Sequence, residues 1–213
     1  MKKVLFLITI VNLGFTGLSQ AQFTQVELFS GLQKTDISLY SSYPLIENQK
    51  LSLNTLAFFQ KFSESENQAF NETGLQPTVF WNFNSHFALG PSLYYNSIAG
   101  YSQRLSAKFQ YQKSRLVLVL IPSLAYSKQS SAYAEAFAQF QYQKPLNKKI
   151  SLWLNGQLLS VWNDLNNHAR SFQQWRAGLS IKGHQFGLGL DWDHYGPLFI
   201  ERQSYGLYYR KTF

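Results

Sequence analysis

The chain has 213 residues and no cysteine, which excludes disulfide bonds and thiolate metal sites. Aromatic residues make up 17% of the chain and charged residues only 14%, whereas a soluble domain usually carries about a quarter charged residues. The formal net charge is +8, but the basic residues are scattered in runs of at most two, which argues against nucleic-acid binding. Few charges and many aromatics favour a protein whose outer surface faces lipid.

The first 21 residues have the pattern of a secretory signal peptide. Two lysines at 2–3 precede an apolar run over 4–11, and Ser19-Gln20-Ala21 offers small residues at the two positions that a signal peptidase reads. We therefore predict cleavage after Ala21 and a single mature domain over 22–213. An uncleaved membrane anchor is the alternative, but the apolar run is short for a span.

Twelve segments after residue 22 alternate between apolar and polar side chains with period two, which predicts half-buried β-strands. They cover about 23–32, 36–43, 50–62, 75–84, 86–97, 102–112, 115–127, 133–143, 150–162, 171–182, 185–193 and 203–213. The first two are the weakest, so ten strands is the alternative count. Strands of about 9–11 residues cross a bilayer when tilted, and an even number returns both chain ends to the periplasmic side.

Two hairpins give testable registers. A two-residue turn at 113–114 would set Tyr111 opposite Leu116 and Phe109 opposite Leu118, so that the apolar faces of the two strands coincide. A turn at 183–184 would make three pairs, which are Leu179 with Leu188, Trp175 with Trp192, and Arg176 with Asp191. Directly opposed charges on one face of an antiparallel pair should form an ion pair.

Aromatic residues on the apolar face gather near the strand ends, as expected of two girdles at the lipid–water boundaries. The predicted external girdle contains Tyr95, Tyr126, Trp162, Trp175, Trp192 and Tyr205. The predicted periplasmic girdle contains Phe83, Phe87, Tyr111, Tyr142 and Phe213. A soluble β-protein would also show alternation, but it would have no reason to place its aromatics in two belts.

The last strand ends the chain on Phe213, with Tyr205, Leu207 and Tyr209 at alternate positions before it. This pattern resembles the C-terminal signal of bacterial outer-membrane β-barrels, although Lys211 stands where that family usually has an apolar residue. The resemblance implies an all-β fold, an antiparallel transmembrane β-barrel, located in the outer membrane among its lipids and inserted there by the barrel-assembly machinery. It implies no particular activity.

Charged residues on the polar face would point into the lumen of such a barrel. We predict that Arg176, Asp191, Arg104, Lys108 and Glu135 set the selectivity of a narrow pore or of a barrel that binds a small ligand. Bulky residues on the same face argue against a wide water-filled channel. A packed interior that only holds the barrel closed is the alternative.

Two other functions remain open from the sequence. An outer-membrane lipid-directed hydrolase would need a nucleophile and a base, and His194, Asp193 and Ser204 at the external rim are weak candidates, with Ser204 expected nearly opposite Asp193. A structural or interaction barrel would bind a partner through its external loops. No convincing catalytic set, calcium loop or phosphate-binding loop is present, so we favour a non-enzymatic barrel over an enzyme and predict no metal and no cofactor.

Overall fold

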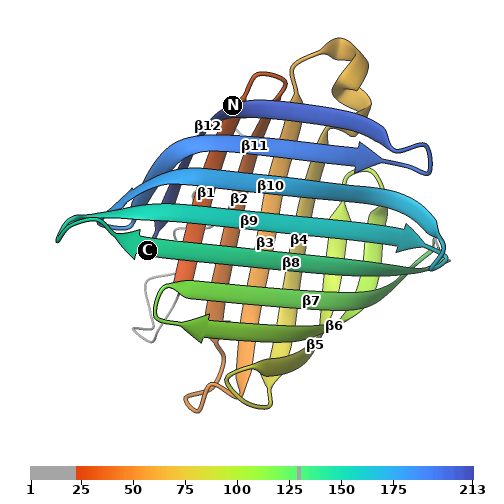
Figure 1. Cartoon of the computed structure of the whole chain (residues 1–213). Coiled ribbons are helices and arrows are strands. Elements are labelled where there is room, and N and C mark those ends of the chain that lie inside the picture. Colours follow the sequence, from red (N-terminus) through yellow and green to blue (C-terminus); the bar gives the residue numbers. More distant parts are fainter. Residues whose placement is uncertain (1–22, 129–130) are drawn as a thin grey trace, which may run out of the picture.

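The structure, a computed structural model that describes residues 23–128 and 131–213, is a closed antiparallel barrel of twelve strands. Each strand pairs with the next along the chain, and β12 pairs with β1 to close the sheet (Figure 1). The strands are β1 (Phe23–Gly31), β2 (Lys34–Pro44), β3 (Leu51–Phe62), β4 (Glu72–Asn82), β5 (Phe87–Asn96), β6 (Gly100–Lys113), β7 (Leu116–Ser127), β8 (Ser131–Pro145), β9 (Ile150–Asn163), β10 (Asn167–Ile181), β11 (His184–Tyr195) and β12 (Ile200–Thr212). The predicted fold and the predicted twelve strands are confirmed, including the first hairpin.

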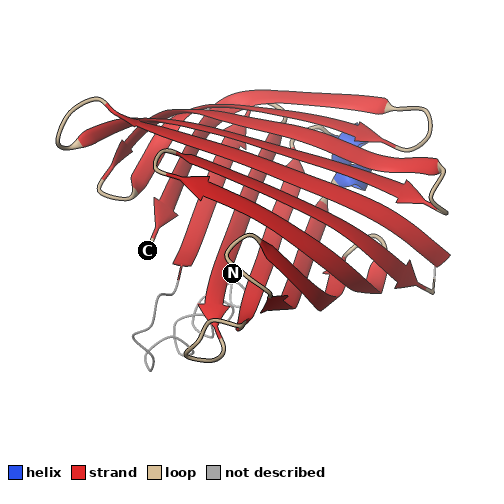
Figure 2. Cartoon of the chain, turned by 60° about the horizontal axis from the view of Figure 1, so that its bottom comes forward, coloured by secondary structure: helices blue, strands red, loops and turns tan. Residues whose placement is uncertain are grey.

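The barrel has two distinct ends. Both described chain ends, Phe23 and Phe213, lie at one end, which we call the terminus end. The other end, which we call the loop end, carries the connections β1–β2, β3–β4, β5–β6, β7–β8, β9–β10 and β11–β12. The β3–β4 connection contains a short 3-10 helix, η1 (Ser65–Phe70), which Figure 2 shows in blue far from the C-terminus. Within the described ranges, no helix is long and apolar enough to cross a membrane. The predicted signal peptide, residues 1–21, lies outside the described residues.

Strands of opposite walls run in different directions. In Figure 1, β8–β11 on the near side run across β1–β4 on the far side. Strong strand tilt of this kind accompanies closure of a sheet into a barrel. As a result, side chains from β10 and β11 can meet side chains from β2, β3 and β4 inside the lumen.

The outer surface is an apolar belt with aromatic residues near its edges. Exposed aromatics at the loop end include Tyr95, Tyr126, Trp162 and Tyr205, and those at the terminus end include Phe83, Phe87 and Phe213. Trp175 is an exception to the predicted girdles, because β10 begins four residues earlier than expected and leaves this ring near the middle of the strand. Lipid is the medium that suits such a surface.

The hairpin predicted to turn at 113–114 turns one residue later, so its predicted register is wrong. Lys113 pairs with Leu116, so Tyr111 lies opposite Leu118 and Phe109 opposite Leu120. The turn is therefore Ser114-Arg115, where Ser114 has a positive φ of 46°. This displacement moves each partner by two residues, which keeps the apolar faces together. Alternation alone cannot distinguish the two registers.

The register of the second hairpin is corrected in the same way. Ile181 pairs with His184, which makes Lys182-Gly183 the turn. Both turn residues have positive φ, 49° and 78°, as a type I′ turn requires, and glycine adopts that conformation without strain. Arg176 consequently lies opposite Gly189, and the residue opposite Asp191 is Gln174.

The seam between β1 and β12 closes the barrel. Seven residue pairs form it, from Gln25 with Thr212 to Gly31 with Gly206. The two glycine backbones approach so closely that a Cβ on Gly206 would lie 2.1 Å from the carbonyl oxygen of Ser30. The close approach at this end of the seam therefore depends on the absence of a side chain.

Candidate functional site in the lumen

Charged side chains along one side of the lumen form a continuous run of ion pairs. Positive and negative groups alternate, so each inner member contacts opposite charges on both sides. We call this run the ion-pair chain, and its members in order of contact are Glu72, Arg170, Asp193, Lys34, Asp191, Arg176, Glu27 and Arg210. They come from β1, β2, β4, β10, β11 and β12. Pairing is what makes the burial of so many charges tolerable.

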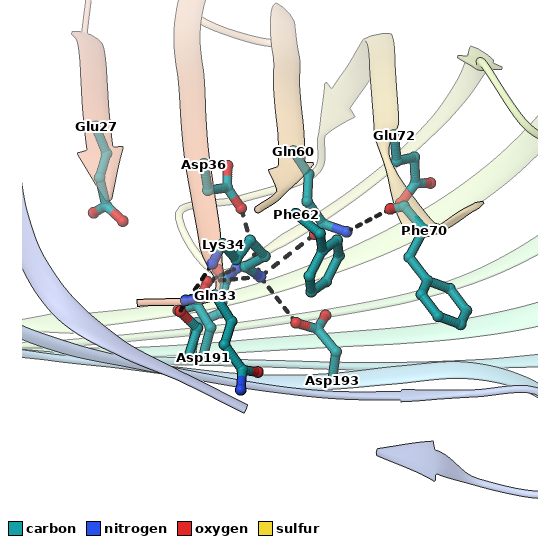
Figure 3. Close-up of polar contacts among 12 residues, drawn as sticks. Glu27, Gln33, Lys34, Asp36, Gln60, Phe62, Phe70, Glu72, Asp191 and Asp193 are labelled. Carbon is teal, nitrogen blue, oxygen red and sulfur yellow. Dashed lines mark hydrogen bonds and ion pairs between the residues drawn. The ribbon is translucent and has the colours of Figure 1, made fainter. Parts of the chain in front are cut away.

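Lys34 is the hub of the chain, and Figure 3 shows its ammonium group between β2 and β11. Its Nζ lies 2.8 Å from Asp191 Oδ2 and 2.9 Å from Asp193 Oδ2. It also donates to Gln60 Oε1 at 3.4 Å, and Asp36 lies at 3.9 Å. The Lys34 side chain has no solvent exposure. Its charge is therefore balanced entirely by protein groups.

Arg176 continues the chain toward the terminus end. Its Nη1 contacts Asp191 Oδ1 at 2.5 Å, and its Nε donates to Glu27 Oε1 at 2.9 Å. The guanidinium also stacks 4.3 Å above the ring of Phe29. Arg210 Nε then donates to the other oxygen of Glu27 at 2.7 Å. The predicted contact between Arg176 and Asp191 is thus present, although the two residues meet diagonally and not as a direct pair.

At the loop end the chain crosses the lumen. Arg170 on β10 pairs with Glu72 on β4, and five strands separate β10 from β4 in either direction around the barrel. The same guanidinium donates to Gln60 Oε1 at 3.1 Å and lies 3.3 Å from Asp193 Oδ1. One arginine therefore joins opposite walls of the barrel.

The β3–β4 connection packs beside the place where Arg170 and Glu72 pair across the lumen. The Phe70 ring stacks on Tyr195 of β11 with a centroid separation of 4.4 Å. Arg202 Nε on β12 donates to Asn67 Oδ1 at 2.7 Å, and Gln60 Nε2 donates to the Phe70 carbonyl at 3.0 Å. The Asn67 side chain is buried in consequence. Together these contacts close the loop end on the side of the ion-pair chain.

The other predicted lumen charges behave differently from one another. Arg104 Nη1 pairs with Glu135 Oε2 at 2.8 Å, and its guanidinium lies 3.8 Å from the centroid of the Tyr94 ring. Lys108 Nζ lies 4.6 Å from the centroid of the Phe80 ring and makes no salt bridge with any residue in 23–128 or 131–213. The five predicted selectivity residues therefore form two separate ion pairs and one unpaired cation.

Toward the terminus end the lumen retains accessible space. Leu56 has the lumen-facing parity of its strand, between Asn54 and Phe58, yet 39% of it is exposed. Lumen-facing residues on the opposite wall are half-buried, and they include Lys108, Gln110, Gln139, Gln141 and Gln157. A lumen packed throughout would leave these side chains buried. The lumen is thus partly accessible on this wall, whereas side chains of the ion-pair chain fill the opposite side at the loop end.

The predicted catalytic candidates do not assemble into one site. Asp193 faces the lumen and is engaged by Lys34, whereas His194, as the next residue of the strand, faces outward. Ser204 lies opposite Asp191, not Asp193, and its Oγ accepts the backbone N–H of Lys34 at 3.1 Å. Ser204 therefore fixes the start of β2. No group of three or more histidine, aspartate or glutamate side chains among the described residues could hold a metal ion.

Sequence reasoning missed three members of the ion-pair chain that lie at the loop end. Lys34, Glu72 and Arg170 all precede the strand starts predicted from alternation. The signal was nevertheless present, because extending each alternating segment outward by one to three residues places these charges on the lumen face. Polar side chains at both faces obscure alternation where a strand leaves the lipid.

Comparison with known proteins supports the fold. No family model and no curated protein matches this sequence. Among solved structures, the chain is similar to the NanC porin, with a TM-score of 0.51, 10% identity, and coverage of 90% of this chain and 98% of that one. Weaker likenesses include an outer-membrane channel from Pseudomonas putida F1, at TM-score 0.49, 14% identity and 92% and 97% coverage. LpxR from Salmonella typhimurium follows at 0.47, 9% identity and 91% and 99% coverage.

The likeness to the NanC porin extends over nearly the whole chain, and at 10% identity it concerns the fold alone. A closed twelve-stranded barrel with a continuous apolar outer belt has one fitting environment, the outer membrane. The protein is thus an outer-membrane β-barrel, and the predicted location is confirmed.

Proposed function

We propose that the protein is a narrow outer-membrane channel for small polar or anionic solutes, with a gate where the ion-pair chain crosses the lumen. The observation that carries the proposal is the contrast between the two halves of the lumen. Toward the terminus end, partly exposed amides line the lumen, whereas toward the loop end Arg170 and Glu72 from opposite walls pair across it. A channel needs this combination of a polar path and a removable barrier.

Unpaired donors toward the terminus end of the lumen favour solutes that accept hydrogen bonds or carry negative charge. Lys108 has no carboxylate partner among the described residues. Trp153 Nε1 and Arg210 Nη1 are buried and have no hydrogen-bond partner within those same ranges. Buried donors of this kind are satisfied by water or by a passing solute. We therefore expect the channel to prefer anions.

Removing the ion pair between Arg170 and Glu72 should open the channel. In planar bilayers, we expect the wild-type protein to show rare, small conductance steps, and Glu72→Gln to show longer openings, because Arg170 loses its partner on β4. Glu201→Gln is the matched control, since this exposed glutamate also lies at the loop end but does not contact the ion-pair chain. Lys108→Gln should reduce the preference for anions without changing the open time.

Heat-modifiable gel migration must first show that each variant is folded. A folded Glu72→Gln barrel that conducts no better than the wild type would overturn the gate. Absence of conductance from both folded proteins would overturn the channel itself.

We also infer that the chain is exported by its signal peptide and inserted by the barrel-assembly machinery through β12. Phe213 is 71% exposed at the terminus end, where a receptor for the last strand can reach it. Phe213→Ala should lower the amount of folded protein in the outer-membrane fraction, whereas Leu207→Ala, on the same face of β12, should lower it less.

The mass of the purified protein should correspond to a chain that starts at Gln22. An intact residue 1–21 segment in that protein would contradict cleavage.

A further inference from the structure

Four polar residues face outward at the loop end of β9, β10 and β11, on the side of the barrel that contacts lipid. We call them the rim patch, which consists of Ser160, His168, Ser171 and His194. Ser171 pairs directly with Ser160 on one side and with His194 on the other. Arg170, next to Ser171, faces the lumen, so Ser171 faces outward.

A β-bulge brings His168 onto the same face. The register of β10 against β9 shifts between His168 and Arg170, so the two residues no longer share a face. The His168 ring accordingly stacks on Phe199 at 4.2 Å and meets the outward-facing Trp162 edge-on at 5.6 Å. Bulges re-aim side chains in this way and often lie beside functional sites.

His168 and Ser171 form a hydrogen-bonded pair, the dyad, and the surroundings fix which of them donates. His168 Nδ1 lies 2.8 Å from the carbonyl oxygen of Gly196, which can only accept, so Nδ1 carries the proton. Nε2 of the neutral ring is then an acceptor, and it lies 3.1 Å from Ser171 Oγ. The serine therefore donates to a histidine that a third group orients. That is the arrangement which activates a serine nucleophile.

The position of the dyad indicates its substrate class. Trp162 and Trp192 flank the rim patch on the outer surface, and tryptophan rings settle at the boundary between hydrocarbon and lipid headgroups. The acyl ester bonds of membrane lipids lie at that boundary. His168 is buried while Ser171 is half-exposed, so a lipid ester can approach the serine but water has limited access to the base.

We propose that His168 and Ser171 hydrolyse an acyl ester of a membrane lipid in the external leaflet. Ser171 Oγ attacks the ester carbonyl carbon while its proton passes to His168 Nε2. The carbon–oxygen bond to the lipid alcohol then breaks, and the departing alkoxide takes that proton, which leaves an acyl-Ser171. Water, deprotonated by His168, attacks the acyl group and releases the fatty acid, and the proton returns to Ser171.

His194 is placed to assist this reaction. It lies directly across from Ser171 on β11, at the separation where facing side chains of an antiparallel pair meet. A ring N–H at that position can donate to the carbonyl oxygen as negative charge develops on it. The proposed site lies beside His194, the residue near which the sequence placed a candidate hydrolase site, but its nucleophile and base are Ser171 and His168 and not Ser204 and Asp193.

The test uses the full mature chain folded in lipid vesicles, with two readouts. The first is fatty acid released from a fluorogenic glycerophospholipid in one set of vesicles and from lipopolysaccharide in another, which distinguishes the two sources of the ester. The second is a covalent adduct of a fluorophosphonate probe, located by mass spectrometry. We expect the adduct on Ser171 and release from at least one of the two lipids.

Ser171→Ala should abolish both signals, and His168→Ala should reduce release about 100- to 10,000-fold. Ser30→Ala is the matched control, because Ser30 is an exposed, outward-facing serine at the loop end of β1, and two strands separate β1 from β10. Folding of every variant is checked by heat-modifiable migration. Release or labelling that persists in Ser171→Ala, or the absence of both from the folded wild-type protein, would overturn the proposal.

Discussion

Replacing Asp191 with asparagine should lower the free energy of unfolding by about 3–5 kcal/mol. Asp191 has no exposed surface and balances two cations, Lys34 at 2.8 Å and Arg176 at 2.5 Å. The substitution leaves both cations in place with one fewer negative charge, in surroundings where water cannot compensate for the loss. Urea unfolding in lipid vesicles, followed by tryptophan fluorescence, measures the change.

Glu135→Gln is the control for this experiment. It also removes a lumen carboxylate from an arginine, but Arg104 is the single charged partner of Glu135 among the residues that the structure describes, and the Glu135 side chain is 13% exposed. We expect a clearly smaller loss of stability. If both variants lose the same free energy of unfolding, linking the ion pairs into a chain adds no stability beyond that of a separate pair.

Replacing Gly206 with valine should prevent the barrel from closing. The Cβ would lie 2.1 Å from the Ser30 carbonyl oxygen and 2.4 Å from the Gly31 Cα, and both obstacles are backbone atoms that cannot rotate away. Either the β1–β12 seam separates at its loop end or the whole barrel fails to fold. We expect the heat-modifiable folded form to be lost on gels.

Leu207→Val separates this effect from a general weakening of β12. Leu207 is the next residue, lies in the same seam opposite Ser30, and faces lipid with 64% exposure. The variant should fold with nearly normal yield. If Gly206→Val folds equally well, the seam has enough freedom to move, and the close approach is incidental.

Alternation of side chains was sufficient to predict the strands, because it reports which face of a strand is apolar wherever that face meets lipid. The same signal cannot fix the register, since a displacement of two residues leaves every face unchanged. This is why Arg176 was expected opposite Asp191 but lies opposite Gly189. The predicted ion pair between Arg176 and Asp191 still forms, because long side chains also reach a diagonal neighbour.

The candidate sites were predicted only where strand geometry is regular. Arg176, Asp191, Arg104 and Glu135 lie in the regular part of their strands, where parity places them on the lumen face. Lys34, Glu72 and Arg170 lie at or near the starts of their strands, where polar side chains occupy both faces and alternation disappears. The His168–Ser171 dyad depends on a bulge, which no periodic pattern can reveal.

The ion-pair chain also has a consequence for the order of folding. Its contacts join residues far apart in sequence: 149 between Glu27 and Arg176, 159 between Lys34 and Asp193, and 183 between Glu27 and Arg210. Contacts of such long range form only after the first and last strands have met. Their stabilisation should therefore slow unfolding and leave the folding rate nearly unchanged. The finished barrel would then be kinetically trapped in its membrane, because it can open only by first separating a buried run of charges.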